Sequence, residues 1–150
     1  MKISEIEYYG AEVDFPQDMK EFWRFGFPED KGWKMHLSHC TLGHCSNMTV
    51  ESLLSSFINR DEECELVIDA VGRYTLPDNE GEVVAFRVKE NKVLVDDFPM
   101  RGENQVFHIT AFTRGTATAK DSNKILNWEL MGEMKLTGRI KFWMKRKKEN

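Results

Sequence analysis

Short runs of β-branched and aromatic residues, several with alternating polar and apolar positions, dominate the chain and predict strands. The run at 35–42 alternates most clearly, and the runs at 82–88 and 92–95 have the separation of a β-hairpin. The expected strands are residues 3–13, 35–42, 65–71, 82–88, 92–95, 105–113 and 139–144. Gly, Pro and acidic residues predict surface loops at 27–32, 77–81 and 96–104.

Helical periodicity is confined to three segments. Residues 50–58 repeat apolar side chains at the spacing of an amphipathic helix, with Thr49 as a suitable N-cap. A second helix is expected over 119–128, behind Thr118 as its cap, and a third over 16–25. The apolar residues of the third helix are spaced for one buried face: Met19, Phe22 and Trp23.

The composition is that of one folded domain over residues 1–150. Hydrophobic residues make up 41% and charged residues 31%, which excludes disordered, collagen-like and low-complexity classes. No apolar run approaches the roughly 18 residues of a membrane span, and the acidic N-terminal stretch does not resemble a secretory signal. The three cysteines are too sparse for a disulfide scaffold. We therefore expect a monomer in the cytoplasm, with the nucleus as the alternative, and no membrane partner.

Charge is distributed unevenly along the chain. Residues 1–100 carry 10 Lys and Arg against 20 Asp and Glu, whereas residues 101–150 carry 11 against 5. An anionic ligand is therefore expected near surface built by the last third of the chain. The alternative is that the C-terminal basic residues form only a solvated tail.

One tripeptide recurs with a similar downstream pattern. His39-Cys40-Thr41 and His108-Ile109-Thr110 are both His-x-Thr, and a threonine that opens an expected helix follows each at the same distance. In a strand, His and Thr of each triplet share one face, while Cys40 and Ile109 face the core. Two imidazoles can serve as base and acid at a phosphodiester, and the hydroxyls can donate to its oxygens. This chemistry requires no metal and no cofactor.

The segments His39-Cys-Thr-Leu-Gly-His44 and Phe107-His108-Ile-Thr110 resemble the two motifs of the 2H phosphoesterase superfamily. Within it, they are most similar to the cyclic phosphodiesterase domain of plant and fungal tRNA ligases. Residues 113–123, which include Lys120, resemble the Thr/Gly-rich turn and Lys-x-x-Asn segment of that domain. The sequence departs from this pattern at Cys40 and at residues 111–112. The resemblance implies an α+β fold of two pseudo-symmetric lobes, each with an antiparallel sheet and flanking helices, and an active cleft between them.

The implied reaction is opening of a 2′,3′-cyclic phosphate, with a 2′-phosphate as the expected product. The substrate would be an RNA terminus or a small cyclic nucleotide, and any RNA kinase or ligase step would belong to other chains. The residues that the resemblance assigns are His39 and His108 as the acid/base pair, Thr41 and Thr110 as phosphate clamps, and His44 and Lys120 as further substrate contacts. Four nearby aromatics are expected in the core, with base stacking as the alternative: Trp33, Phe107, Phe112 and Trp128.

Two other functions stay open from the sequence. A domain of the same fold could bind RNA ends or nucleotides without turning them over. A zinc site could alternatively use the ligands His36, His39, Cys40, His44 and Cys45. Closed zinc sites usually combine two separated ligand pairs, and a strand would direct His39 and Cys40 to opposite faces, which disfavours zinc.

Overall fold

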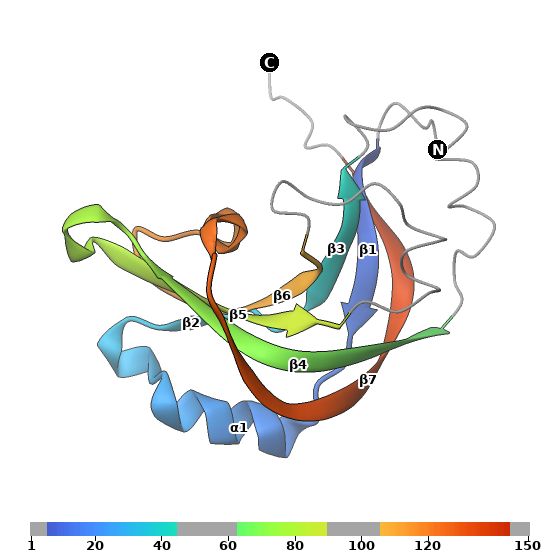
Figure 1. Ribbon diagram of the computed structural model, residues 1–150, viewed down its shortest axis with the longest axis horizontal. Coiled ribbons are helices and arrows are strands. Elements are labelled where there is room, and N and C mark those ends of the chain that lie inside the picture. The colour runs from blue at the N-terminus through green and yellow to red at the C-terminus, as the bar shows by residue number, and fades with distance from the viewer. Residues whose placement is uncertain (1–5, 45–62, 90–105, 145–150) are drawn as a thin grey trace.

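The computed structural model describes residues 6–44, 63–89 and 106–144, in which six antiparallel strands close into a barrel (Figure 1). The strand order is β6-β3-β1-β7-β4-β5, and β5 pairs back with β6, which closes the ring. A short seventh strand, β2, pairs with β6 beside β3. The strands are β1 (Ile6–Val13), β2 (Lys34–Met35), β3 (His39–His44), β4 (Glu63–Thr75), β5 (Gly81–Val88), β6 (His108–Gly115) and β7 (Trp128–Met144).

The expected fold of two pseudo-symmetric lobes with flanking helices is wrong. Strand β7 pairs with β1 along one part of its length and with β4 along another, so it joins the two halves of the chain into one sheet. The prediction of a helix over 119–128 is also wrong, because this region contains only a short 3₁₀ helix, η5, over Ala119–Lys124. Its Asp-Ser-Asn sequence at 121–123 is a poor helix former, since these side chains bond to nearby backbone groups.

Most expected strands are found, although several have different bounds. Strands β4 and β7 are longer than expected, and the single strand expected over 35–42 is interrupted between β2 and β3. The loops at 27–32 and 77–81 contain the 3₁₀ turns η2 (Glu29–Lys31) and η4 (Pro77–Asn79). The predictions that lie outside the described residues are the helix at 50–58 with Thr49, the strand and hairpin at 92–95, and the loop at 96–104.

The core follows from the alternation of the strands. Cys40 and Ile109 are completely buried, as expected for the middle residue of each triplet. Trp33, Phe107 and Phe112 are also buried, which confirms their expected place in the core, whereas Trp128 is half-buried. Large apolar side chains of β4 to β6 complete this cluster: Leu66, Ile68, Val84, Phe86 and Val88.

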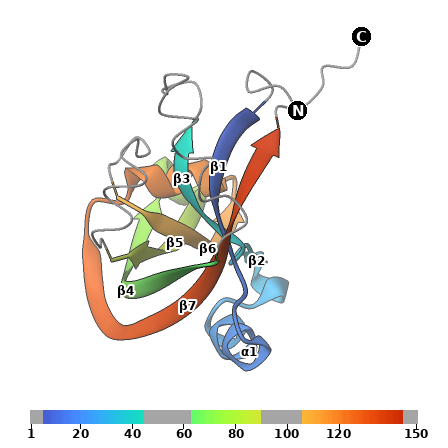
Figure 2. The same ribbon diagram turned by 90° about the vertical axis from the view of Figure 1, so that its right-hand side faces the viewer.

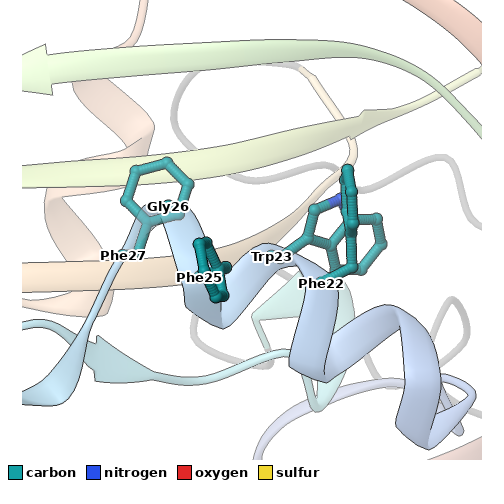
Figure 3. A pocket seen from close by; sticks show the side chains of 5 residues that line it. All are labelled: Phe22, Trp23, Phe25, Gly26 and Phe27. Carbon is teal, nitrogen blue, oxygen red and sulfur yellow. The ribbon is translucent and has the colours of Figure 1, made fainter.

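Helix α1 (Gln17–Gly26) confirms the third expected helix, and it packs below the strands in Figure 1. The ring centroid of Trp23 lies 4.7 Å from that of Phe86, which docks the helix on the core. The expected single buried face is wrong, because the Phe22 side chain is 76% exposed. Figure 3 shows the apolar pocket of about 430 Å³ at the C-terminal end of α1. Among the described residues, no helix has the length and apolar character needed to cross a membrane.

Candidate functional site

The two His-x-Thr triplets lie on neighbouring strands. Strands β3 and β6 pair antiparallel (Figure 2). In this pairing, Cys40 is opposite Ile109. This register sets position 39 across from position 110, and position 41 across from position 108. Because both middle residues point into the core, the flanking side chains of His39, His108 and Thr110 belong to the opposite face. Two segments far apart in the sequence are thus brought together.

An irregular turn before β3 sets the position of His39. Between Met35, which is opposite Phe112, and Cys40, which is opposite Ile109, the chain holds more residues than β6 does over the same span. Leu37 absorbs this excess with a positive φ of 43°, and its N–H donates to the Thr110 carbonyl at 3.0 Å. A positive φ in a leucine costs about 1–3 kcal/mol, and burial of the Leu37 side chain offsets that cost.

Both ring nitrogens of His108 are engaged by the protein. Nδ1 lies 2.8 Å from the Val106 carbonyl oxygen and donates to it. Nε2 lies 2.9 Å from the Ser122 hydroxyl oxygen, and this serine of η5 is fully buried. Since the carbonyl can only accept, the neutral ring carries its proton on Nδ1 and its lone pair on Nε2.

Segment η5 extends this contact to Thr110. The hydroxyl oxygens of Thr110 and Ser122 are 3.1 Å apart, and Ser122 Oγ also lies 2.6 Å from the Ala119 carbonyl oxygen. The backbone N–H of Thr118 donates to the Asp121 carboxylate at 2.8 Å, which stabilises the start of η5. Thr118 therefore does precede a helical turn, as expected, although the turn is short.

The surroundings of His39 are different. Its Nδ1 lies 2.9 Å from the Ser38 hydroxyl, and Glu12 of β1 is opposite it in the pairing of β1 with β3. His36 lies nearby, with its Nε2 2.8 Å from the Thr113 hydroxyl. Among the side chains that the structure describes, those of His36, His39 and His108 thus lie around β3 and β6.

Burial lowers the pKa of His36, His39 and His108 below the ordinary value. For His39, burial is the largest cause; the Glu12 carboxylate raises its pKa, while His36 and His108 lower it. For His108, burial outweighs the hydrogen bond to Val106, which raises its pKa. At neutral pH the rings are therefore mainly uncharged, and charge on His36 or His108 disfavours charge on His39. The pair of His39 and His108 can accept a proton at one imidazole and donate a proton from the other.

The structure brings together three of the six site residues expected from the sequence. His39, His108 and Thr110 gather at the β3–β6 pair, while Lys120 is exposed on η5. Thr41 and His44 belong to β3, and their side chains lie outside the described part of the structure. The sequence did not single out Ser122 or Glu12. Ser122 lies within the 113–123 segment quoted for the resemblance, but no local pattern links it to His108.

For His39 and Cys40 to bind one zinc ion, both side chains would have to lie on the same side of β3, yet Cys40 is buried in the core on the other face of that strand. In the described ranges 6–44, 63–89 and 106–144, no group of three or more His, Cys, Asp or Glu residues is arranged to hold a metal ion. Cys45 lies outside these ranges.

The described contacts therefore define a candidate acid/base site at the β3–β6 pair. The resemblance to the 2H phosphoesterase superfamily stays a prediction that rests on the motif residues, since the two-lobed fold it implied is not found. No protein-family model matches the chain, and no curated protein is significantly similar to it.

Proposed function

We propose that this chain is a metal-independent phosphodiesterase that opens 2′,3′-cyclic phosphates at RNA ends or in small cyclic nucleotides. The observation that carries the proposal is the placement of His39 and His108 on neighbouring strands, on the face opposite the core. The lowering of the His39 pKa by the charge of His108 supports this placement. Thr110 adds a hydroxyl to the same face.

The reaction needs two proton transfers. One neutral imidazole accepts a proton as water attacks phosphorus, and the electron pair of the broken O–H bond forms the new P–O bond. The bond from phosphorus to the 3′ oxygen breaks, and the second imidazole, in its charged form, protonates that oxygen. A 2′-phosphate remains. Hydroxyl donors on the non-bridging oxygens stabilise the charge that develops there, and Thr41 is the proposed donor.

RNA ends are a suitable substrate class because the last third of the chain is basic. Residues 101–150 carry 11 Lys and Arg against 5 Asp and Glu, and Lys120 is exposed on η5 next to the site. A cation there can contact the phosphate backbone that leads to the cyclic end. In an RNA repair sequence, separate kinase and ligase chains would supply the other steps.

Two contacts favour a second candidate, a domain that binds RNA ends without turning them over. Both nitrogens of His108 are occupied by Val106 and Ser122, so this ring could be a structural residue with no direct access to substrate. Such a domain would still bind a cyclic or terminal phosphate beside His39.

Incubation of the protein with adenosine 2′,3′-cyclic monophosphate in EDTA tests the proposal. We expect hydrolysis to a monophosphate, and we expect His39→Ala and His108→Ala each to lower the rate about 10²–10⁴-fold. Thr116→Ala is a matched control, because its hydroxyl is exposed and bonds only weakly to the Glu80 carbonyl, at 3.4 Å. Turnover that survives both histidine substitutions contradicts the proposal. Saturable binding with no turnover supports the second candidate instead.

A further inference from the structure

We infer that Ser122 connects His108 to Thr110 as a proton relay, so that His108 accepts the proton of the attacking water through two hydroxyls. This inference deepens the proposed function and rests on it. Ser122 is then a positioning residue that acts through its neighbours, while the hydroxyl of Thr110 is the group that meets the water.

The distances form a continuous chain. Thr110 Oγ1 lies 3.1 Å from Ser122 Oγ, and Ser122 Oγ lies 2.9 Å from His108 Nε2. The Ser122 side chain is fully buried, so solvent does not replace either bond. The opposite ring nitrogen is closed off by the Val106 carbonyl at 2.8 Å. The two contacts of Ser122 therefore join Nε2 to the Thr110 hydroxyl.

The direction of the chain follows from the number of protons. Because neutral His108 has its proton on Nδ1, Nε2 can only accept, and the Ala119 carbonyl, 2.6 Å from the same serine oxygen, can also only accept. The single proton of Ser122 is therefore shared between these two acceptors, and the relay uses the orientation in which it points to Nε2. Ser122 has a single proton, so across its contact with Thr110 it can only accept. Thr110 then donates inward and presents its remaining lone pair outward. This polarity is the one that a base requires.

The transfer is balanced at each atom. The water proton moves to Thr110 Oγ1, the original Thr110 proton moves to Ser122 Oγ, and the original Ser122 proton moves to His108 Nε2. The oxygen left by the water bonds to phosphorus, and His108 becomes an imidazolium. Its new N–H donates to Ser122, whose hydroxyl can now donate to the Ala119 carbonyl at 2.6 Å.

The charged groups near His108 include two ion pairs and the exposed Lys120 of η5. Arg87 of β5 is opposite His108 in the strand pairing, and its guanidinium binds the Asp69 carboxylate of β4 at 2.9 Å. On η5, the Asp121 carboxylate binds Lys124 at 3.0 Å. From β3, His39 is the ring whose pKa responds to His108. On β7, the uncharged ring of Trp128 lies at a centroid distance of 6.4 Å from the His108 ring.

Titration of the His108 ring by nitrogen NMR tests the chain in the protein without substrate. We expect Ser122→Ala to lower the His108 pKa further, because the charged ring loses its acceptor and charged hydrogen bonds are the stronger ones. We expect Thr110→Val to raise it. In Thr110→Val, the neutral state loses the hydrogen bond that Thr110 donates to Ser122. The charged state loses less, because the Ala119 carbonyl still accepts from Ser122 and His108 donates to it. Opposite shifts are the signature of a directed chain.

Two kinds of variant separate the relay from simple packing of η5. Thr118→Ala removes the contact of the Thr118 hydroxyl with the Asp121 carboxylate at 3.4 Å but leaves the Ser122 hydroxyl in place, so the His108 pKa should stay at the wild-type value. Thr110→Ser keeps the hydroxyl and should restore the wild-type titration if the valine variant folds poorly. An unchanged pKa in Ser122→Ala, or the same shift in Thr118→Ala, would overturn the inference.

Turnover provides the second readout. We expect Ser122→Ala and Thr110→Val each to lower kcat about 100-fold, the lower range for loss of a general base, with little change in KM. Thr110→Ser should recover most of the rate. Wild-type kcat retained in both hydroxyl-deleted variants would overturn the relay while the phosphodiesterase proposal stands. If wild-type protein shows no turnover, the proposed function fails, and the NMR titration still decides whether the hydrogen-bonded chain exists.

Discussion

The two halves of the site share one tripeptide pattern but have different surroundings. On β6, Val106 and Ser122 hold both nitrogens of His108, and η5 packs on the same side. On β3, Ser38 bonds the His39 ring, and the Glu12 carboxylate raises the pKa of His39 against the effect of burial. The middle residues, Cys40 and Ile109, are equivalent, since both are completely buried. The difference therefore comes from the segments around the triplets.

This comparison shows how identical residues can take opposite roles. The uncharged form of His108 is polarised toward proton uptake by its hydrogen-bonded chain, which suits a general base. His39 has a carboxylate that favours its charged form, which suits the acid that protonates the leaving oxygen. Within the proposed function, we therefore propose that His108 of the β6 half is the base and His39 of the β3 half is the acid.

The largest expected effect separates these roles by the leaving group. A phosphodiester with a nitrophenyl leaving group does not need an acid, because that oxygen leaves as a stable anion. His39→Ala should therefore regain most of its about 10²–10⁴-fold loss on this substrate, whereas His108→Ala should not. Rescue of His108→Ala with no rescue of His39→Ala would reverse the assignment.

Gly72→Ala should disturb only the β6 half. A Cβ at this position of β4 would come within 2.8 Å of the Trp128 ring and would clash with Ile125, the residue after η5. Overpacking of this kind costs about 1–3 kcal/mol of stability. We expect a lower thermal midpoint and shifted His108 resonances, with His39 resonances unchanged. Equal shifts of the His39 and His108 resonances would contradict this expectation, because they would show that η5 affects both halves of the site alike.

Acidification should destabilise both halves together. The pKa values of His36, His39 and His108 are lowered in the folded state, so the unfolded chain binds more protons below its own histidine pKa of about 6.5. The contribution of these histidines to stability is complete above that pH, and it is lost as the pH falls through their pKa values in the folded state. Thermal unfolding from about pH 7.5 to about pH 5.5 should show a falling midpoint, with a shallower slope in His36→Gln. A midpoint that rises on acidification contradicts the pKa directions.

The smallest effect is expected from Glu12→Gln, which should lower the pKa of His39 and leave that of His108 in place. The reason is that the Glu12 charge is a cause of the His39 shift and not of the His108 shift. In the pH–rate profile, the alkaline limb should move to lower pH, because it reports loss of the acid's proton. Glu21→Gln, an exposed substitution on α1, is the matched control. A shift of the acidic limb alone would contradict the assignment, because it would mean that the Glu12 carboxylate acts on the base, His108, and not on the acid, His39.

The local parts of this picture could be predicted from the sequence. Alternation along a strand depends on neighbouring residues only, so the burial of Cys40 and Ile109 and the shared face of His108 and Thr110 followed from the triplets. Helix α1 was also predicted to within a residue or two of its bounds. In each case the signal lies within one element.

The closure of the barrel and the second-layer contacts could not be predicted in this way. Whether β7 continues from β4 to β1 depends on pairing between residues far apart in sequence. The motif resemblance covered short segments, which constrain the face of a strand but not the way a sheet closes. Ser122 was missed because its partners, His108 and Thr110, reach it only through the packing of η5 on β6.

The central claim is that His39 and His108 act on one phosphorus atom as a unit. The most direct measurement is the rate of hydrolysis of adenosine 2′,3′-cyclic monophosphate in EDTA by the wild type, His39→Ala, His108→Ala and the double variant. Because residues that act as a unit are strongly non-additive, we predict that the double variant is no slower than the slower single variant. Losses that multiply would contradict the claim, since they would mean that the two imidazoles contribute independently.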